Sequence, residues 1–100
     1  MKTIGYYIRK ANAAVEEGIK AENNFCVALS KNKHNSNDET CELLETAKKT
    51  YQTAKRHVKN VYAVLELDAP KMTSIHSVQM YMERINTKFA AFWEDIQNNK

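Results

Sequence analysis

A single carboxylate interrupts an apolar stripe in the first third of the sequence. Apolar residues recur every three or four positions from residue 4 to residue 29, and Glu22 takes one of those positions. An isolated buried carboxylate is costly. Glu22 is therefore either an acid–base or ligand-binding group with a raised pKa, or a polar core residue that reaches solvent or hydrogen-bonds Tyr51 or Lys48. We favour the second interpretation; a hydrogen bond from Glu22 to Tyr51 or Lys48 would also fix the register of the helices.

The cysteines and histidines lack the spacing of a metal site. Cys26 and Cys41 form no Cys-x-x-Cys motif, and His34, His57 and His76 are not four residues apart on one helix. The two cysteines fall at the same end of a predicted helical hairpin, where a disulfide could form. Two free, half-buried thiols are the commoner case in a reducing compartment, and we favour them here.

Motifs of catalysis are missing from the sequence. It contains no glycine-rich phosphate loop, no His-Glu-x-x-His and no Gly-x-Ser-x-Gly string. A slim helical bundle with a filled core also offers little room for a concave site that holds a nucleophile, a base and an oxyanion donor. We therefore expect no enzymatic activity, no cofactor and no bound metal.

Cations gather on one predicted helix and in the loop before it. They are Lys48, Lys49, Lys55, Arg56 and Lys59 on the helix, with Lys31 and Lys33 in the loop. Glu42 and Glu45 precede the helical lysines, and Glu45 is three and four residues before Lys48 and Lys49, the order that stabilises a solvated helix face. Few of the fifteen cations are arginine, the residue best suited to bidentate contacts with phosphate or guanine. Nucleic-acid binding is thus the weaker alternative, although these seven residues would carry it.

Tyrosine and methionine side chains outside the predicted core suggest a docking surface. Tyr6 and Met80 lie opposite the apolar seam. Three further residues flank the seam: Tyr62, Tyr81 and Met72. Aromatic and methionine residues are enriched in protein interfaces. We expect these five residues to meet at one end of the molecule, where they would bind a protein partner or a second copy of the chain.

The elements that position these residues follow from composition and periodicity. Two glycines and one proline in 100 residues, with 43% hydrophobic and 27% charged, indicate helices in one domain, residues 1–100. Heptad-like seams predict helices over 3–29, 38–67 and 71–97. A polar loop separates the first two helices, and we expect a tight turn before the third. The fold class is therefore all-α: an antiparallel, up-down-up three-helix bundle with coiled-coil packing.

Two details of this bundle can be tested directly. Ser36 and Glu39 match a capping box, which would begin the second helix. Pairing the three seams in antiparallel register places Gly18 against Tyr51 and Phe89. A glycine in mid-helix costs about 1 kcal/mol relative to alanine, so room for these bulky rings would explain it.

The function that these features favour is a non-enzymatic protein-interaction module, such as an adaptor, an inhibitor or an assembly factor, that presents a rigid helical surface. One alternative is the nucleic-acid-associated protein described above. The other is a small inhibitor that a mobile element encodes and that acts on a host protein. No stretch has the length and hydropathy of a signal peptide or a membrane span. We therefore expect a soluble, cytoplasmic protein that binds no membrane.

Overall fold

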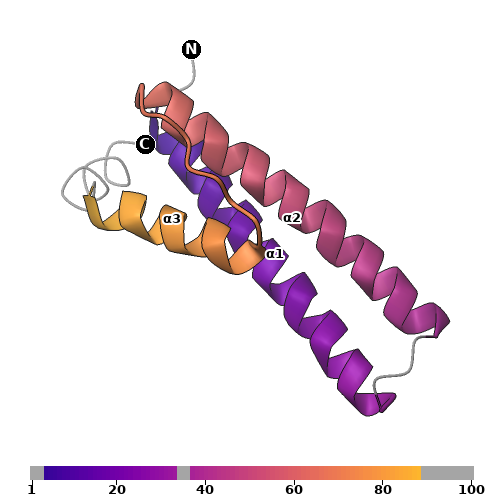
Figure 1. Ribbon diagram of the computed structural model, residues 1–100. Coiled ribbons are helices and arrows are strands. Elements are labelled where there is room, and N and C mark those ends of the chain that lie inside the picture. Colours follow the sequence, from indigo (N-terminus) through magenta and orange to yellow (C-terminus); the bar gives the residue numbers. More distant parts are fainter. Residues whose placement is uncertain (1–3, 34–36, 89–100) are drawn as a thin grey trace.

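The first two helices form a long antiparallel hairpin. The computed structural model describes residues 4–33 and 37–88; in it α1 spans Ile4–Lys31 and α2 spans Asp38–Val64 (Figure 1). Both helices carry the apolar stripe that their sequences predict, which Glu22 interrupts in α1. These stripes face each other, so the hairpin buries them between the two helices.

Small residues allow the two helices of the hairpin to approach each other closely. Ala11 and Gly18 on α1 are buried, as are Ala47 and Ala54 on α2. A Cβ atom added to Gly18 would lie 3.6 Å from the backbone carbonyl oxygen of Thr50. This contact is one residue away from the predicted pairing of Gly18 with Tyr51, so the register of the hairpin is close to the prediction.

A capping box begins α2, but its residues differ from the predicted pair. The Thr40 amide donates to Asn37 Oδ1 at 2.9 Å, and the Asn37 amide donates to Thr40 Oγ1 at 2.8 Å. The prediction that Ser36 and Glu39 form this box is wrong in its position by one residue, and Ser36 itself lies outside the described residues. Asn37 has the same spacing to Thr40, and Thr40 is only 2% exposed, so burial favours this pair.

Replacing Asn37 with alanine is expected to lower the free energy of unfolding by about 1 kcal/mol, because the Thr40 amide loses its acceptor. Urea denaturation followed by circular dichroism measures the change. Ser36→Ala is the control; a larger loss in that variant than in Asn37→Ala would contradict the cap at Asn37.

A left-handed residue ends α2 earlier than predicted. Glu66 has a φ of 59°, its amide donates to the Ala63 carbonyl at 3.0 Å, and the Leu67 amide donates to the Tyr62 carbonyl at 2.9 Å. This is the Schellman arrangement, in which the chain leaves the helix axis and satisfies the last carbonyl groups. The helix therefore ends at Val64, before the proline that was expected to stop it.

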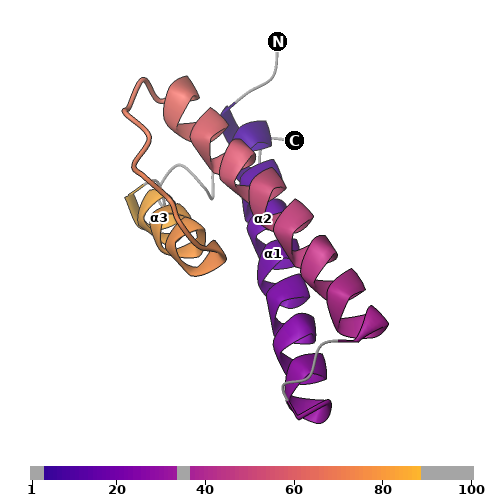
Figure 2. The same ribbon diagram turned by 45° about the vertical axis from the view of Figure 1, so that its right-hand side comes forward.

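The next segment, residues 65–74, is an extended connection rather than a tight turn. It leads from the C-terminal end of α2 back to the middle of the hairpin (Figure 1, Figure 2). There the Ser77 amide donates to Ser74 Oγ and the Ser74 amide to Ser77 Oγ, at 3.1 and 3.0 Å. These reciprocal bonds cap α3, which spans Ile75–Lys88 and so begins after the predicted residue 71.

Helix α3 is antiparallel to α1 and runs in the direction of α2. Its first residue, Ile75, lies against Gly18, whereas Asn86 near its described end bonds Asn12. The all-α three-helix bundle is confirmed. The predicted up-down-up order of its helices is wrong for the third helix, because the extended connection leads back along the hairpin and α3 then runs in the direction of α2. The predicted layers of the third helix are therefore wrong: Gly18 makes room for Ile75, not Tyr51, and Phe89 lies outside the described residues.

The core lies where α3 and the connection pack onto the hairpin. All four seam residues of the described part of α3 are buried, as their spacing predicts. Together with buried residues of the other elements they form one cluster: Ile8, Ala11, Val15, Ala54, Val58, Val61, Met72, Ile75, Val78, Met82 and Ile85. Every element thus contributes to this cluster, which fixes α3 and the connection on one half of the hairpin.

Candidate functional site

The five residues predicted to form a docking surface have different environments. Met80 is exposed, with 41% of its surface accessible, on the side of α3 away from the core. Tyr6, Tyr62 and Tyr81 are half-buried. Met72 is only 1% exposed, because the connection folds it into the core. The prediction that Met72 lies on the surface is therefore wrong.

The tyrosines of this set are engaged within the chain. The Tyr6 ring packs edge-on against Tyr7, with ring centroids 5.5 Å apart. Burial raises the pKa of the Tyr62 phenol, Tyr81 adds to the rise and the Arg84 guanidinium opposes it. Tyr62 and Tyr81 thus lie near each other where α2 meets α3, whereas Tyr6 belongs to the first turn of α1.

Tyr51 and Glu22 do not form the predicted polar pair. The Tyr51 hydroxyl donates to the Met72 carbonyl at 3.0 Å and so anchors the connection to α2. Glu22 is half-buried, and its Oε1 accepts a long contact of 4.0 Å from Cys26 Sγ. Glu22 therefore reaches the edge of the bundle, as the polar-core interpretation expects, but Tyr51 fixes the connection instead of pairing with it.

The predicted cations occupy two separate places. Lys31 and Lys33 are exposed at the tip of the hairpin. The other five predicted cations lie on α2. Lys55 is half-buried, and the remaining four are exposed: Lys48, Lys49, Arg56 and Lys59. The Lys55 Nζ lies 5.7 Å from the Tyr51 ring centroid. The cations of α2 thus include one in contact with an aromatic ring, which the sequence pattern did not indicate.

Both cysteines are free and exposed. Cys26 lies on α1 and Cys41 on α2, both in the part of the hairpin nearest its tip. They are therefore more accessible than the half-buried thiols that were expected. Within residues 4–33 and 37–88, no three Cys, His, Asp or Glu side chains form a group that could hold a metal ion.

Burial lowers the pKa of the His57 imidazole below its ordinary value of 6.5, and Arg56 and Lys10 lower it further. The folded state therefore binds this proton less readily than the unfolded chain. The contribution of His57 to the free energy of unfolding is therefore fully present above pH 6.5. It is lost as the pH falls from 6.5 toward the lower pKa of the folded state.

Replacing His57 with glutamine is expected to reduce this loss of stability between pH 7.5 and 5.5, a window around the reference pKa. Urea midpoints of the two proteins at both pH values measure it. His76→Gln is the matched control, because His76 is exposed on α3. Equal pH dependence in the wild type and His57→Gln would rule out the contribution of His57.

The half of the hairpin nearest its tip has no third layer among the described residues. Because α3 begins at Gly18 and runs toward Asn12, it leads away from this half, residues 19–31 and 38–50, which we term the distal half (Figure 1, Figure 2). Its larger apolar side chains are only partly buried: Phe25, Leu29, Leu43 and Leu44. Val27 is 54% exposed.

A small notch marks the border between the distal half and α3. It has a volume of about 160 Å³ and is lined by Leu44, Ala47, Tyr51 and Ile75, with Glu22 among its polar residues.

Comparison with known protein families, curated proteins and solved structures finds no match for this chain. Its function must therefore be argued from these surfaces.

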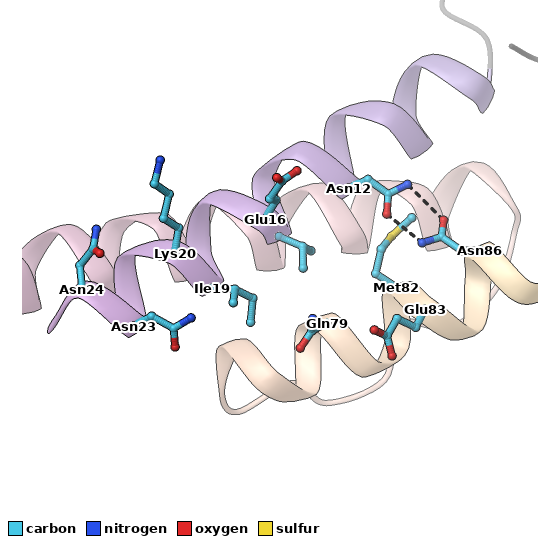
Figure 3. A pocket seen from close by; sticks show the side chains of 11 residues that line it. Asn12, Glu16, Ile19, Lys20, Asn23, Asn24, Gln79, Met82, Glu83 and Asn86 are labelled. Carbon is cyan, nitrogen blue, oxygen red and sulfur yellow. Dashed lines mark hydrogen bonds between the residues drawn. The ribbon is translucent and has the colours of Figure 1, made fainter. Parts of the chain in front are cut away.

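A second, larger groove lies between α1 and α3 (Figure 3). Its volume is about 630 Å³. The lining residues are mostly amides and charged side chains: Asn12, Val15, Glu16, Ile19, Lys20, Asn23, Asn24, Gln79, Met82, Glu83 and Asn86. The sequence patterns did not predict this groove, because Gln79 of α3 and Asn23 and Asn24 of α1 line it together only when α3 is antiparallel to α1.

One amide pair closes an end of this groove. Asn12 Nδ2 donates to Asn86 Oδ1 at 3.1 Å, and Asn86 Nδ2 donates back to Asn12 Oδ1 at 2.8 Å (Figure 3). Both residues are half-buried at the edge of an apolar seam. Asparagine at the margins of two seams is the only sequence signal that could have pointed to this contact.

Proposed function

We propose that this chain is a non-enzymatic protein-interaction module that binds its partner through the distal half of the α1/α2 hairpin. One observation carries the proposal: α3 covers only the other half of the hairpin. Such a surface suits an adaptor, an inhibitor or an assembly factor, since each acts by binding another protein. Among residues 4–33 and 37–88, no helix is long and apolar enough to cross a bilayer.

The physical reason lies in the two-layered packing of the distal half. Two helices alone leave Phe25, Leu29 and Leu44 partly in contact with water. A partner that covers them gains about 2.5 kcal/mol for each 100 Å² of apolar surface removed from water. A partner helix placed in line with α3 would also reach the notch beside Ile75, whose volume of about 160 Å³ suits one apolar side chain.

The native thiols provide a test of this surface. Cys26 and Cys41 are exposed and lie on the distal half, so a bulky maleimide on either would block a partner there. We expect the wild-type chain to capture a protein from an extract of its source, and alkylation to abolish that capture.

A matched control moves the thiol away from the distal half. In a Cys26→Ser, Cys41→Ser, Asn60→Cys variant, alkylation should leave capture intact, because Asn60 is exposed near the other end of α2. Circular dichroism checks that each alkylated protein stays helical. Undiminished capture by the alkylated wild type would exclude the distal half as the binding surface.

A second function, nucleic-acid binding, is favoured by one observation. Cations lie over tyrosine rings on the side where α2 meets α3: Lys55 over Tyr51, and Arg84 over Tyr81 at 5.2 Å from guanidinium carbon to ring centroid. Rings and cations on one face can bind single strands by stacking and phosphate contacts. A mobility shift with single-stranded RNA or DNA that weakens steeply between about 50 and 200 mM salt would support this function. The absence of a shift at the lower salt would exclude it.

A further inference from the structure

The groove between α1 and α3 has a firm apolar floor. Met82 is 1% exposed and Val15 is 6% exposed, and both belong to the hydrophobic core. Ile19 is half-buried and points toward α3 (Figure 3). A ligand in the groove would therefore rest on side chains that are already held in place by core packing.

Amide side chains dominate the rim of the groove. The Asn12–Asn86 pair uses one N–H and one oxygen lone pair of each amide, so a second donor and a second acceptor remain on each residue. The side-chain amides of Asn23, Asn24 and Gln79 make no hydrogen bond with any described residue. The rim thus offers both donors and acceptors along its length.

This lining suits an extended peptide better than a helix. Each residue of an extended segment has a backbone N–H and C=O that need partners, whereas those of a helix are bonded internally. From Asn12 to Asn24 the groove follows α1 for about 18 Å, at 1.5 Å rise per residue. An extended chain covers that length with about five or six residues.

Charge selects the side chains that such a peptide would carry. Glu16 on α1 and Glu83 on α3 are both exposed, and neither forms an ion pair with any residue among 4–33 and 37–88. Among the described residues that line the groove, Lys20 is the one cation. The lining is therefore acidic on balance, although the whole chain carries a formal charge of +3. Carboxylates and amide oxygens together accept hydrogen bonds from lysine or arginine.

We propose that the groove between α1 and α3 binds an extended peptide segment in which a lysine or arginine stands beside an apolar residue. The apolar residue rests on Val15, Ile19 and Met82, and the basic side chain reaches Glu16 and Glu83. The groove shares Ile19, Lys20, Asn23 and Asn24 of α1 with the distal half. Its other side is formed by α3, whereas the other side of the distal half is α2, so the module would have two adjacent binding surfaces.

Nuclear magnetic resonance titration of the full, isotope-labelled chain tests the proposal. The probes are three acetylated hexapeptides that alternate leucine with lysine, glutamate or glutamine. The lysine peptide should shift the side-chain amide signals of Asn12, Asn86 and Gln79, and should bind about tenfold more tightly than the other two. In a Glu16→Gln, Glu83→Gln variant this preference should disappear.

The matched control is Glu39→Gln, Glu42→Gln, which removes two exposed carboxylates from α2 and should keep the preference. Equal binding of the three peptides, shifts that leave Asn12, Asn86 and Gln79 unchanged, or no binding by any of them would each overturn the proposal. None of these outcomes bears on thiol-dependent capture by the distal half, so the two proposals fail separately.

Discussion

Replacing Met72 with alanine is expected to lower the free energy of unfolding by about 3 kcal/mol, a large loss for one side chain outside any helix. Met72 is 1% exposed and belongs to the core cluster, although it lies in the extended connection. Truncation removes its buried apolar groups and leaves a cavity between the connection and the helices. Urea denaturation followed by circular dichroism measures the loss.

The matched control is Met80→Ala, the same substitution at a site that is 41% exposed. It should change the free energy of unfolding by less than about 0.5 kcal/mol. A third variant, Tyr51→Phe, removes the hydroxyl that donates to the Met72 carbonyl and should cost about 1 kcal/mol. Equal losses for the two methionine variants would show that the connection does not pack on the core.

Apolar periodicity predicted the helices and their buried faces because it reports which side of a helix avoids water. The seam through Ile75, Val78, Met82 and Ile85 is buried as expected, and so is Gly18. The start of α2 was also predicted correctly, since polar residues that can cap a helix precede it. These features depend on residues close together in the sequence.

The direction of α3 could not be predicted in the same way. A heptad-like seam has nearly the same spacing when it is read backward, so it defines a buried face but no direction. The direction depends on the connection, for which the sequence predicts a tight turn at Pro70. The left-handed Glu66 and the burial of Met72 make that segment extended. A left-handed conformation is uncommon for a residue other than glycine, so the sequence does not indicate it at Glu66, and the burial of Met72 is a tertiary effect. The groove follows from that direction, and so does a distal half that no described part of α3 covers, so neither could be inferred from the sequence.

Replacing Gly18 with leucine is expected to lower the free energy of unfolding by about 3 kcal/mol, because a side chain there meets Ile75. A Cβ atom alone would contact the Ile75 δ-methyl group, which is the flexible end of its side chain. Gly18→Ala should therefore stay within about 1 kcal/mol of the wild type, since better helix propensity offsets a small shift of Ile75. Leucine is too large for that shift, and the Thr50 carbonyl on the other side is backbone and cannot yield.

A double-mutant cycle then decides which residue Gly18 faces. Ile75→Ala alone leaves a cavity and should cost about 3 kcal/mol, but the leucine of Gly18→Leu can fill that space. The double variant should therefore lose at least about 1 kcal/mol less than the two single variants together. Gly18→Leu combined with Ile85→Ala, at the other end of α3, should be additive within about 0.5 kcal/mol. Additivity in the first pair would place Ile75 away from Gly18, as a third helix parallel to α1 would require. Coupling in the first pair alone would establish that α3 begins at Gly18. Together with the bonds between Asn12 and Asn86, that start directs α3 back along α1, the arrangement that forms the groove and leads the described part of α3 away from the distal half.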